Sequence, residues 1–152
     1  MNRFLTGLAA LSLCTAGAAY AQDYSAQLKA RQGQFRILAI NLGTLGGMAQ
    51  GKIDYDAEAA QMAADSVVAV SMIHQGPLWP EGSSEMGVDG TRAKAEIWDN
   101  FDDFGAKWSG LGEAALNMQA AAGTGQEALG PALGQLGGAC KACHDTYRAP
   151  ES

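Results

Sequence analysis

The stretch IWDNFDDFGAKWSGLGEAALNMQAAA, residues 97–122, carries the clearest structural signal in this sequence. Its apolar side chains recur at steps of four and three residues, which is the spacing of one face of a helix that packs against other helices. The residues on this face are Ile97, Phe101, Phe104, Trp108, Leu111, Ala115, Met118 and Ala122. The stretch therefore predicts one long, unbroken helix of a helical bundle.

Three other segments show the same helical spacing, and strand-like alternation is scarce. They are residues 25–51, residues 57–75 and residues 129–147. Asp54 or Asp56 is placed to cap the start of the second segment, because a carboxylate there accepts hydrogen bonds from free backbone N–H groups. Short polar breaks follow the first and third helices, and such breaks are typical of antiparallel neighbours.

The second and third helices are separated by QGPLWPEGSSEMGVDGTR, residues 75–92, which is rich in Gly, Pro and Ser. This composition predicts a long crossover loop. Pro131 falls early in the last segment and leaves the start of that helix undefined by several residues. We expect an all-α fold, an antiparallel four-helix bundle with a crossover loop between its second and third helices.

The first 21 residues have the pattern of a cleaved secretory signal. Arg3 precedes an apolar run, and the segment ends in the small-x-small sequence Ala19-Tyr20-Ala21. The run is too rich in Gly and Ala to be a good membrane anchor. We predict a signal peptide over residues 1–21 and a single mature domain over residues 22–152.

The predicted mature chain is acidic. Arg3 is the only charged residue removed with the signal, so nine Lys and Arg remain against sixteen Asp and Glu, a formal charge of −7. Such a charge disfavours binding to nucleic acids and to anionic membranes.

Chemistry is concentrated in ACKACHDTYR, residues 139–148, near the end of the chain. The pattern Cys-x-x-Cys-His is the covalent attachment signature of c-type haem. It predicts one haem c, held by Cys140 and Cys143, with His144 as the iron ligand. A thioredoxin-like pair would need a βαβ unit, and a zinc site would need more ligands than the only other histidine, His74, supplies.

A second axial ligand would have to come from upstream of the haem motif, because residues 145–152 contain no Met, His, Cys or Lys. Met118 lies on the apolar helix face, where core packing is the simpler explanation. Met86 lies in the long loop, which can bring it toward the iron, so Met86 stays a candidate ligand. The upstream candidates are His74, Met48, Met62, Met72, Met86 and Met118.

Arg31, Phe35 and Arg148 are further candidate site residues. Arg31 interrupts an apolar face, where a charge is costly unless paired, so haem propionates are its predicted partners; the alternative is an arginine that extends to solvent at the bundle end. Phe35, one turn later, would cover the distal side with a ring that cannot coordinate iron. Arg148, one turn after His144, would affect the imidazole or a ligand there, or would act only as a cation at a helix C-terminus.

Four stretches together resemble the cytochrome c′ family of bacterial class II c-type cytochromes: KARQGQFRILAINLG, LWPEGS, TRAKAEIWDN and GACKACHDTYR. The similarity spans essentially the whole mature chain. It implies a homodimeric periplasmic four-helix bundle with high-spin haem, His144 as proximal ligand, and an apolar distal pocket that admits NO and, in the ferrous state, CO.

The resemblance also carries over to single positions. It places Arg31 at the propionate-contacting arginine, Phe35 at the bulky distal position and Arg148 at the basic residue beside the proximal ligand. Low-spin relatives have Met at the distal position, so Phe35 argues against that branch. We expect a gas-binding haem protein rather than an enzyme, since no distal acid or base is visible. The alternative function is electron transfer between periplasmic redox partners.

Overall fold

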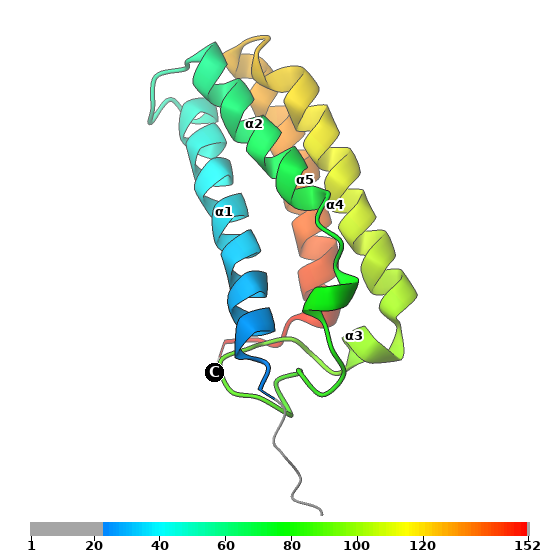
Figure 1. The fold of residues 1–152 in the computed structure, drawn as a ribbon. Coiled ribbons are helices and arrows are strands. Elements are labelled where there is room, and N and C mark those ends of the chain that lie inside the picture. The colour runs from blue at the N-terminus through cyan, green and yellow to red at the C-terminus, as the bar shows by residue number, and fades with distance from the viewer. Residues whose placement is uncertain (1–22, 152) are drawn as a thin grey trace, which may run out of the picture.

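The computed structural model describes residues 23–151 of the chain, and the predicted signal peptide lies outside these residues. Four long helices form the antiparallel bundle that the sequence predicts (Figure 1). They are α1 (Ser25–Ala49), α2 (Ala57–Ser71), α4 (Phe101–Ala122) and α5 (Gln126–Tyr147). Within the described part, no helix combines the length and apolar character that crossing a membrane requires. The all-α prediction is confirmed.

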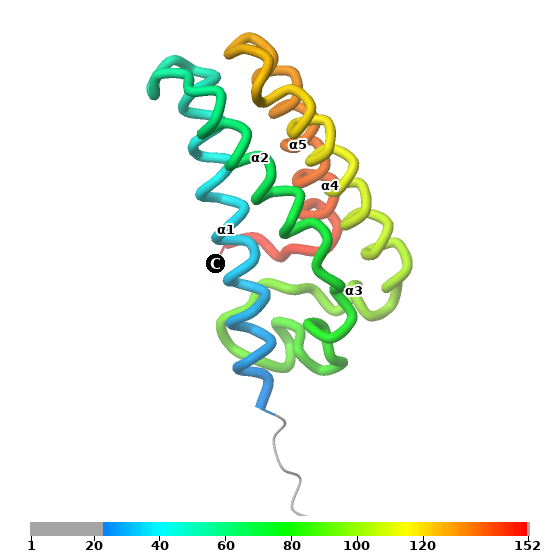
Figure 2. Tube along the Cα trace, turned by 45° about the horizontal axis from the view of Figure 1, so that its top comes forward, coloured from blue at the N-terminus to red at the C-terminus, as the bar shows by residue number. Residues whose placement is uncertain are grey.

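Each long helix packs against two neighbours: α1 and α4 each contact both α2 and α5. The connection from α2 to α4 contains the 3₁₀ turn η1 (Gly76–Leu78) and the one-turn helix α3 (Glu96–Asp99). Figures 1 and 2 show this connection gathered at one end of the bundle, beside the start of α1 and the end of α5. We call this end the loop end, and the opposite end, with the two short turns, the closed end.

The start of α2 is set by Asp56, as the sequence suggests. Its backbone is extended, and its Oδ1 accepts a hydrogen bond of 2.7 Å from the backbone N–H of Ala59. This bond satisfies one of the N–H groups that a helix start leaves free. The first two helices end earlier than residues 51 and 75, because α1 stops at Ala49 and α2 at Ser71.

The prediction of one unbroken helix over residues 97–122 is wrong. Asn100 leaves the helical region with φ −143° and ψ 60°, and its side chain accepts a hydrogen bond from the backbone N–H of Asp103. An asparagine side chain can replace a backbone hydrogen-bond partner, which lets it end α3 and begin α4. Ile97 and Phe104 are nevertheless both buried, so the apolar spacing continues across a break in the backbone.

Two clusters of apolar side chains hold the bundle together. The larger one joins the four long helices toward the closed end and is rich in Ala, Leu and Val, with Leu45, Val67 and Leu136 among its buried members. The smaller one, at the loop end, is built around Trp79, Ile97, Phe104 and Tyr147. Small side chains at the closed end let the helices approach closely, whereas the loop end is filled by rings.

Candidate functional site

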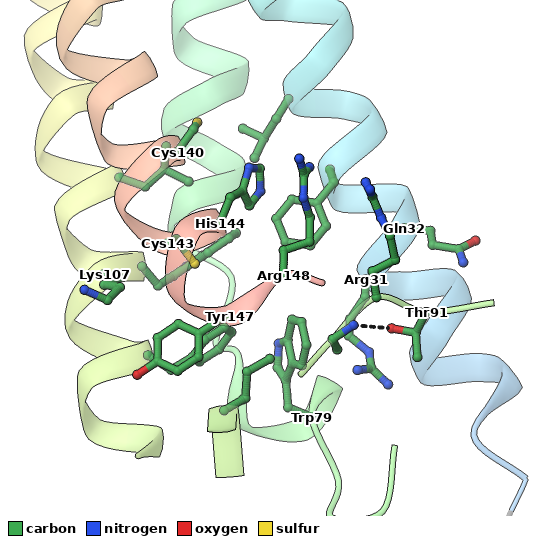
Figure 3. A pocket seen from close by; sticks show the side chains of 18 of the residues that line it. Arg31, Gln32, Trp79, Thr91, Lys107, Cys140, Cys143, His144, Tyr147 and Arg148 are labelled. Atoms are coloured by element: carbon green, nitrogen blue, oxygen red, sulfur yellow. Dashed lines mark hydrogen bonds between the residues drawn. The ribbon is translucent and has the colours of Figure 1, made fainter. Parts of the chain in front are cut away.

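A cavity of about 550 Å³ lies between the two clusters, lined by α1, α4, α5 and the long connection. This volume falls within the roughly 300–1,000 Å³ typical of cofactor sites. Cys140, Cys143 and His144 all line it, and Figure 3 shows the three side chains projecting from the last turns of α5. The structure therefore brings the three residues of the predicted attachment motif to one cavity.

The two cysteines are half-buried and are not joined to each other by a disulfide. They lie one helical turn apart on α5, so both sulfurs are available to one group in the cavity. Burial raises the pKa of both thiols, which keeps them protonated at neutral pH. The donor set fits a group that is held by two thioether bonds.

The imidazole of His144 is suited to bind a metal ion. Burial lowers its pKa, and the positive charges of Arg148 and Arg92 lower it further. A neutral imidazole keeps a lone pair for an iron ligand. The fold thus holds His144 in the protonation state that coordination requires.

Arg31 is a buried cation without an anionic partner. The residue is 4% exposed, and its guanidinium carbon lies 4.4 Å from the centre of the Trp79 ring. Nη1 donates a 3.3 Å hydrogen bond to the carbonyl of Ser83, whereas Nε and Nη2 have no partner. Burial lowers the pKa of the group. The interpretation of Arg31 as a solvated arginine at the bundle end is wrong.

The charges that line the cavity favour an anionic group. Five cationic side chains line it, and none of the lining residues is Asp or Glu. This contrasts with the whole chain, where acidic residues outnumber basic ones by sixteen to ten. The cationic residues are Arg31, Arg36, Arg92, Lys107 and Arg148. An unpaired buried guanidinium in such a cavity fits a carboxylate such as a haem propionate.

Phe35 also lines the cavity, from α1, and is 39% exposed. Its ring meets that of Trp108 from α4 edge-on, with ring centres 6.1 Å apart. The Nε1 of Trp108 is buried without a hydrogen-bond acceptor. The two rings form an apolar wall that offers no iron ligand.

Arg148 sits at the end of α5, where its backbone N–H bonds to the carbonyl of His144 at 3.1 Å. Its backbone has left the helix and forms an isolated antiparallel bridge with Ala93. In Figure 3 its side chain runs beside the imidazole of His144. Arg148 is thus more than a cation at a helix end, because it lines the cavity.

None of the upstream candidates for a second axial ligand lines the cavity. Met48 and Met118 are buried in the larger cluster, whereas Met62, Met72 and Met86 are exposed. His74 is exposed as well. His144 is the only histidine among the lining residues, and no methionine is present.

Sequence reasoning missed the lining residues that the long connection supplies. Trp79, Thr91 and Arg92 reach the cavity from it, and Lys107 and Tyr147 reach it from α4 and α5. The signal for Trp79 was a large aromatic residue in a loop otherwise rich in Gly and Pro. Tyr147 lies on the apolar face of the last predicted helix, which indicated burial and not a site. The other three had no sequence signal of their own.

Comparison with known proteins identifies this arrangement. A family model described as Cytochrome C′ matches residues 26–148. A relative named cytochrome c′, from Cereibacter sphaeroides, is 40% identical over 148 residues, which are 97% of this chain and 98% of the relative. The chain belongs to the cytochrome c′ family. The family assignment makes it a haem c-binding cytochrome, in a family of gas-binding or electron-carrying haem proteins rather than classical enzymes.

Two further similar proteins carry different names within the cytochrome c′ family. A relative named cytochrome c-554, from the same organism, is 41% identical over 128 residues, which are 84% of each chain. A solved structure described as cytochrome c′ from Rhodobacter Spheriodes is 39% identical, with a TM-score of 0.81 over 86% of this chain and 100% of its own. Relatives with two different names are thus equally similar in sequence, and overall identity does not choose between them.

Proposed function

We propose that this chain is a periplasmic c-type haem protein whose high-spin, five-coordinate iron binds NO, and CO when ferrous, in NO binding or detoxification with redox capability. The observation that carries the proposal is the donor set of the cavity. It offers one imidazole, from His144, and no methionine or second histidine. A second protein ligand would be needed for a low-spin, closed iron site.

The chain's own residues have separate tasks in this proposal. Cys140 and Cys143 hold the haem covalently, His144 ligates the iron, and Arg31 pairs with a propionate. The haem supplies an iron centre that binds diatomic gases and changes oxidation state. Arg148 lines the cavity beside His144, where it would contact a ligand bound on that side.

The Phe35 ring is the proposed source of selectivity. It offers no acid, base or hydrogen-bond donor, and it would crowd ligands on the side of the cavity that α1 covers. NO binds ferrous iron strongly without a hydrogen bond, whereas bound O₂ needs one. The Phe35 side of the cavity therefore favours NO over O₂.

Solved relatives support gas binding. A variant of cytochrome c′ from Alcaligenes xylosoxidans, 26% identical with a TM-score of 0.73, is described as a nitric oxide complex. Another variant of the same protein, 25% identical, is described with carbon monoxide bound. We extend this ligand class to the present chain because its cavity is lined by one histidine and by no methionine.

Absorption spectra of the purified holoprotein test the proposal. High-spin bands in the ferric protein and adducts with NO and CO after reduction are expected. Low-spin bands in the resting protein would mean two protein ligands and would end the five-coordinate assignment.

Phe35→Ala tests the role of the wall. We expect CO association to become about tenfold faster, which corresponds to a barrier lower by about 1.4 kcal/mol. Phe101→Ala is the control, because Phe101 packs at the loop end without lining the cavity. An unchanged association rate in Phe35→Ala would remove Phe35 from the ligand path.

Electron transfer between periplasmic partners is the second candidate function. Its support is the acidic mature chain, which would steer toward basic partners with a rate that falls as salt rises. An iron site that lacks a second ligand argues against it, because changes of ligation slow electron exchange. Low-spin spectra would favour this candidate over gas binding.

We also propose that the protein is a homodimer through the outer sides of α1 and α2. These helices carry exposed large apolar residues, among them Ile37 and Ile40 on α1 and Met62 on α2; Ile40 is 70% exposed. A relative 28% identical is described as a cytochrome c′ with ligand-controlled dimer dissociation. Sedimentation of Ile40→Glu against wild type tests this, since an unchanged dimer would place the interface elsewhere.

The signal peptide and the periplasmic location stay predictions. They rest on the pattern of residues 1–21 and on the need to export the chain before haem is attached. N-terminal sequencing of the secreted protein should begin at Gln22. A start at Met1 would contradict the prediction.

A further inference from the structure

Two buried glutamine side chains form a hydrogen-bonded network with Trp79, whose ring lies under the guanidinium of Arg31. The side chains of Gln34 on α1 and Gln75 in the long connection exchange two hydrogen bonds, of 3.0 and 3.1 Å. The Oε1 of Gln75 also accepts from the indole Nε1 of Trp79 at 2.9 Å, and its Nε2 also donates to the carbonyl of Ile73 at 2.9 Å. Gln75 therefore uses its full hydrogen-bonding capacity in a buried position.

This network fixes the ring of Trp79. The indole N–H is held by Gln75, and the backbone carbonyl of Trp79 accepts from the Nε1 of Trp98 at 3.0 Å. Phe104 packs edge-on against the same ring, with centres 4.8 Å apart. A ring with a bonded edge and packed faces has little freedom to turn.

The fixed ring in turn orients Arg31. Its guanidinium lies over Trp79 at 4.4 Å, and one N–H is used by the carbonyl of Ser83. A planar guanidinium held on a ring face by one further hydrogen bond has a defined direction for its remaining donors. Figure 3 shows Arg31 and Trp79 together at the lower end of the cavity.

We infer that Gln75 is a positioning residue for the anionic end of the haem, acting through Trp79 on Arg31, with Gln34 as its support. This inference rests on the proposed haem site. Gln75 and Gln34 do not line the cavity themselves. Their effect on the cofactor therefore passes through the indole.

The redox equilibrium reports the position of Arg31. A cation close to the haem stabilises the ferrous state relative to the more positive ferric state, and desolvation strengthens this effect. When the indole N–H of Trp79 loses its hydrogen bond to Gln75, the ring is free to turn. The guanidinium of Arg31 can then move away from the haem propionate with which we propose that it pairs. The midpoint potential should then fall.

The experiment is potentiometry of the holoprotein in a double-mutant cycle. Gln75→Met keeps the side-chain volume and removes the hydrogen bonds, and Trp79→Phe keeps an aromatic face and removes the indole donor. We expect each to lower the equilibrium constant for reduction of the ferric to the ferrous haem by about threefold to tenfold, where tenfold is about 59 mV for one electron. Gln34→Met should give a smaller shift in the same direction.

The double variant separates positioning from general disruption. If Gln75 acts through the indole N–H, Gln75→Met has no further effect in the Trp79→Phe background. The double variant also removes the indole N–H together with its acceptor, so this donor is not left unpaired. Gln34 loses its partner in the single and in the double Gln75→Met variant alike, so its loss cancels in the cycle. Additive shifts, or a wild-type potential in folded Gln75→Met, would overturn the inference.

Gln126→Met is the matched control, since Gln126 donates to the carbonyl of Met48 at 2.7 Å at the closed end. It should leave the potential unchanged, and an equal shift there would count against a local role for Gln75. Failure of the haem assignment looks different. A colourless wild-type protein would end the proposed function, whereas a red protein with unshifted variants would end only this inference.

Discussion

The two ends of the bundle satisfy their buried polar groups to different degrees. At the closed end, the Tyr55 hydroxyl donates to the carbonyl of Ala122, and Gln126 donates to that of Met48. Within residues 23–151, all five buried side-chain atoms without a hydrogen-bond partner lie toward the loop end or the cavity. They belong to Gln27, Arg31, Glu85 and Trp108.

A buried polar atom without a partner lowers the free energy of unfolding, so such atoms indicate a site that serves function and not the stability of the fold. The closed end contributes close packing of small side chains and satisfied hydrogen bonds. The loop end contributes a cavity, cationic side chains and rings. Changes at the closed end should therefore alter unfolding, and changes at the loop end should alter the haem.

The largest expected effect is the loss of the cofactor. The double change Cys140→Ser and Cys143→Ser should abolish covalent haem, because no thiol then remains in the described chain to form a thioether. Acid-acetone extraction of the secreted protein measures it. The wild type should keep its colour through extraction, and a variant that also kept it would refute the attachment site.

Leu45→Ala should give the largest loss of stability at the closed end. Leu45 is 0% exposed in the larger cluster, and truncating such a leucine costs about 2–5 kcal/mol of unfolding free energy. Leu116→Ala is the control, since Leu116 is 54% exposed and should change stability by about 0.5 kcal/mol or less. Urea unfolding of both variants checks the contrast, and equal losses would refute it.

Arg31→Met should act in opposite ways on two forms of the chain. In the background without both cysteines, which lacks covalent haem, removing an unpaired buried charge should leave stability unchanged or raise it by about 1 kcal/mol or more. In the holoprotein, the same change should lower the midpoint potential. Urea unfolding and potentiometry measure the two effects, and a destabilised haem-free variant would show that Arg31 is paired within the protein.

The smallest expected effect separates two neighbouring aspartates. Asp56→Ala should cost about 1 kcal/mol, because Asp56 caps α2 through the N–H of Ala59. Asp54→Ala should cost little, since Asp56 alone holds the cap position. Thermal unfolding compares the two variants. A larger loss of stability in Asp54→Ala than in Asp56→Ala would assign the capping role to Asp54.

Local patterns predicted much of this protein. Helical spacing located four helices, Asp56 was one of two expected caps, and the Cys-x-x-Cys-His motif selected Cys140, Cys143 and His144, which all line the cavity. The same spacing missed the break at Asn100, because periodicity follows residue order and is blind to a single non-helical residue between two helices.

The long connection shows why the rest could not be predicted. Its composition indicated a loop, yet Gln75 and Trp79 are buried there, and Thr91 and Arg92 line the cavity. Gln75 meets Gln34 across 41 residues of chain, and Ser83 meets Arg31 across 52. No periodic signal encodes such a pairing.

The sequence by itself determined the helical class, the attachment motif and the presence of a charge in an apolar helix face. These features are set by neighbouring residues, through backbone periodicity and side-chain chemistry. Only the tertiary structure decided that Arg31 lies buried on Trp79 with unpaired donors and that, among residues 23–151, no second histidine and no methionine line the cavity. Those facts depend on which distant segments share one space, and that is fixed only when the four helices and the long connection pack together.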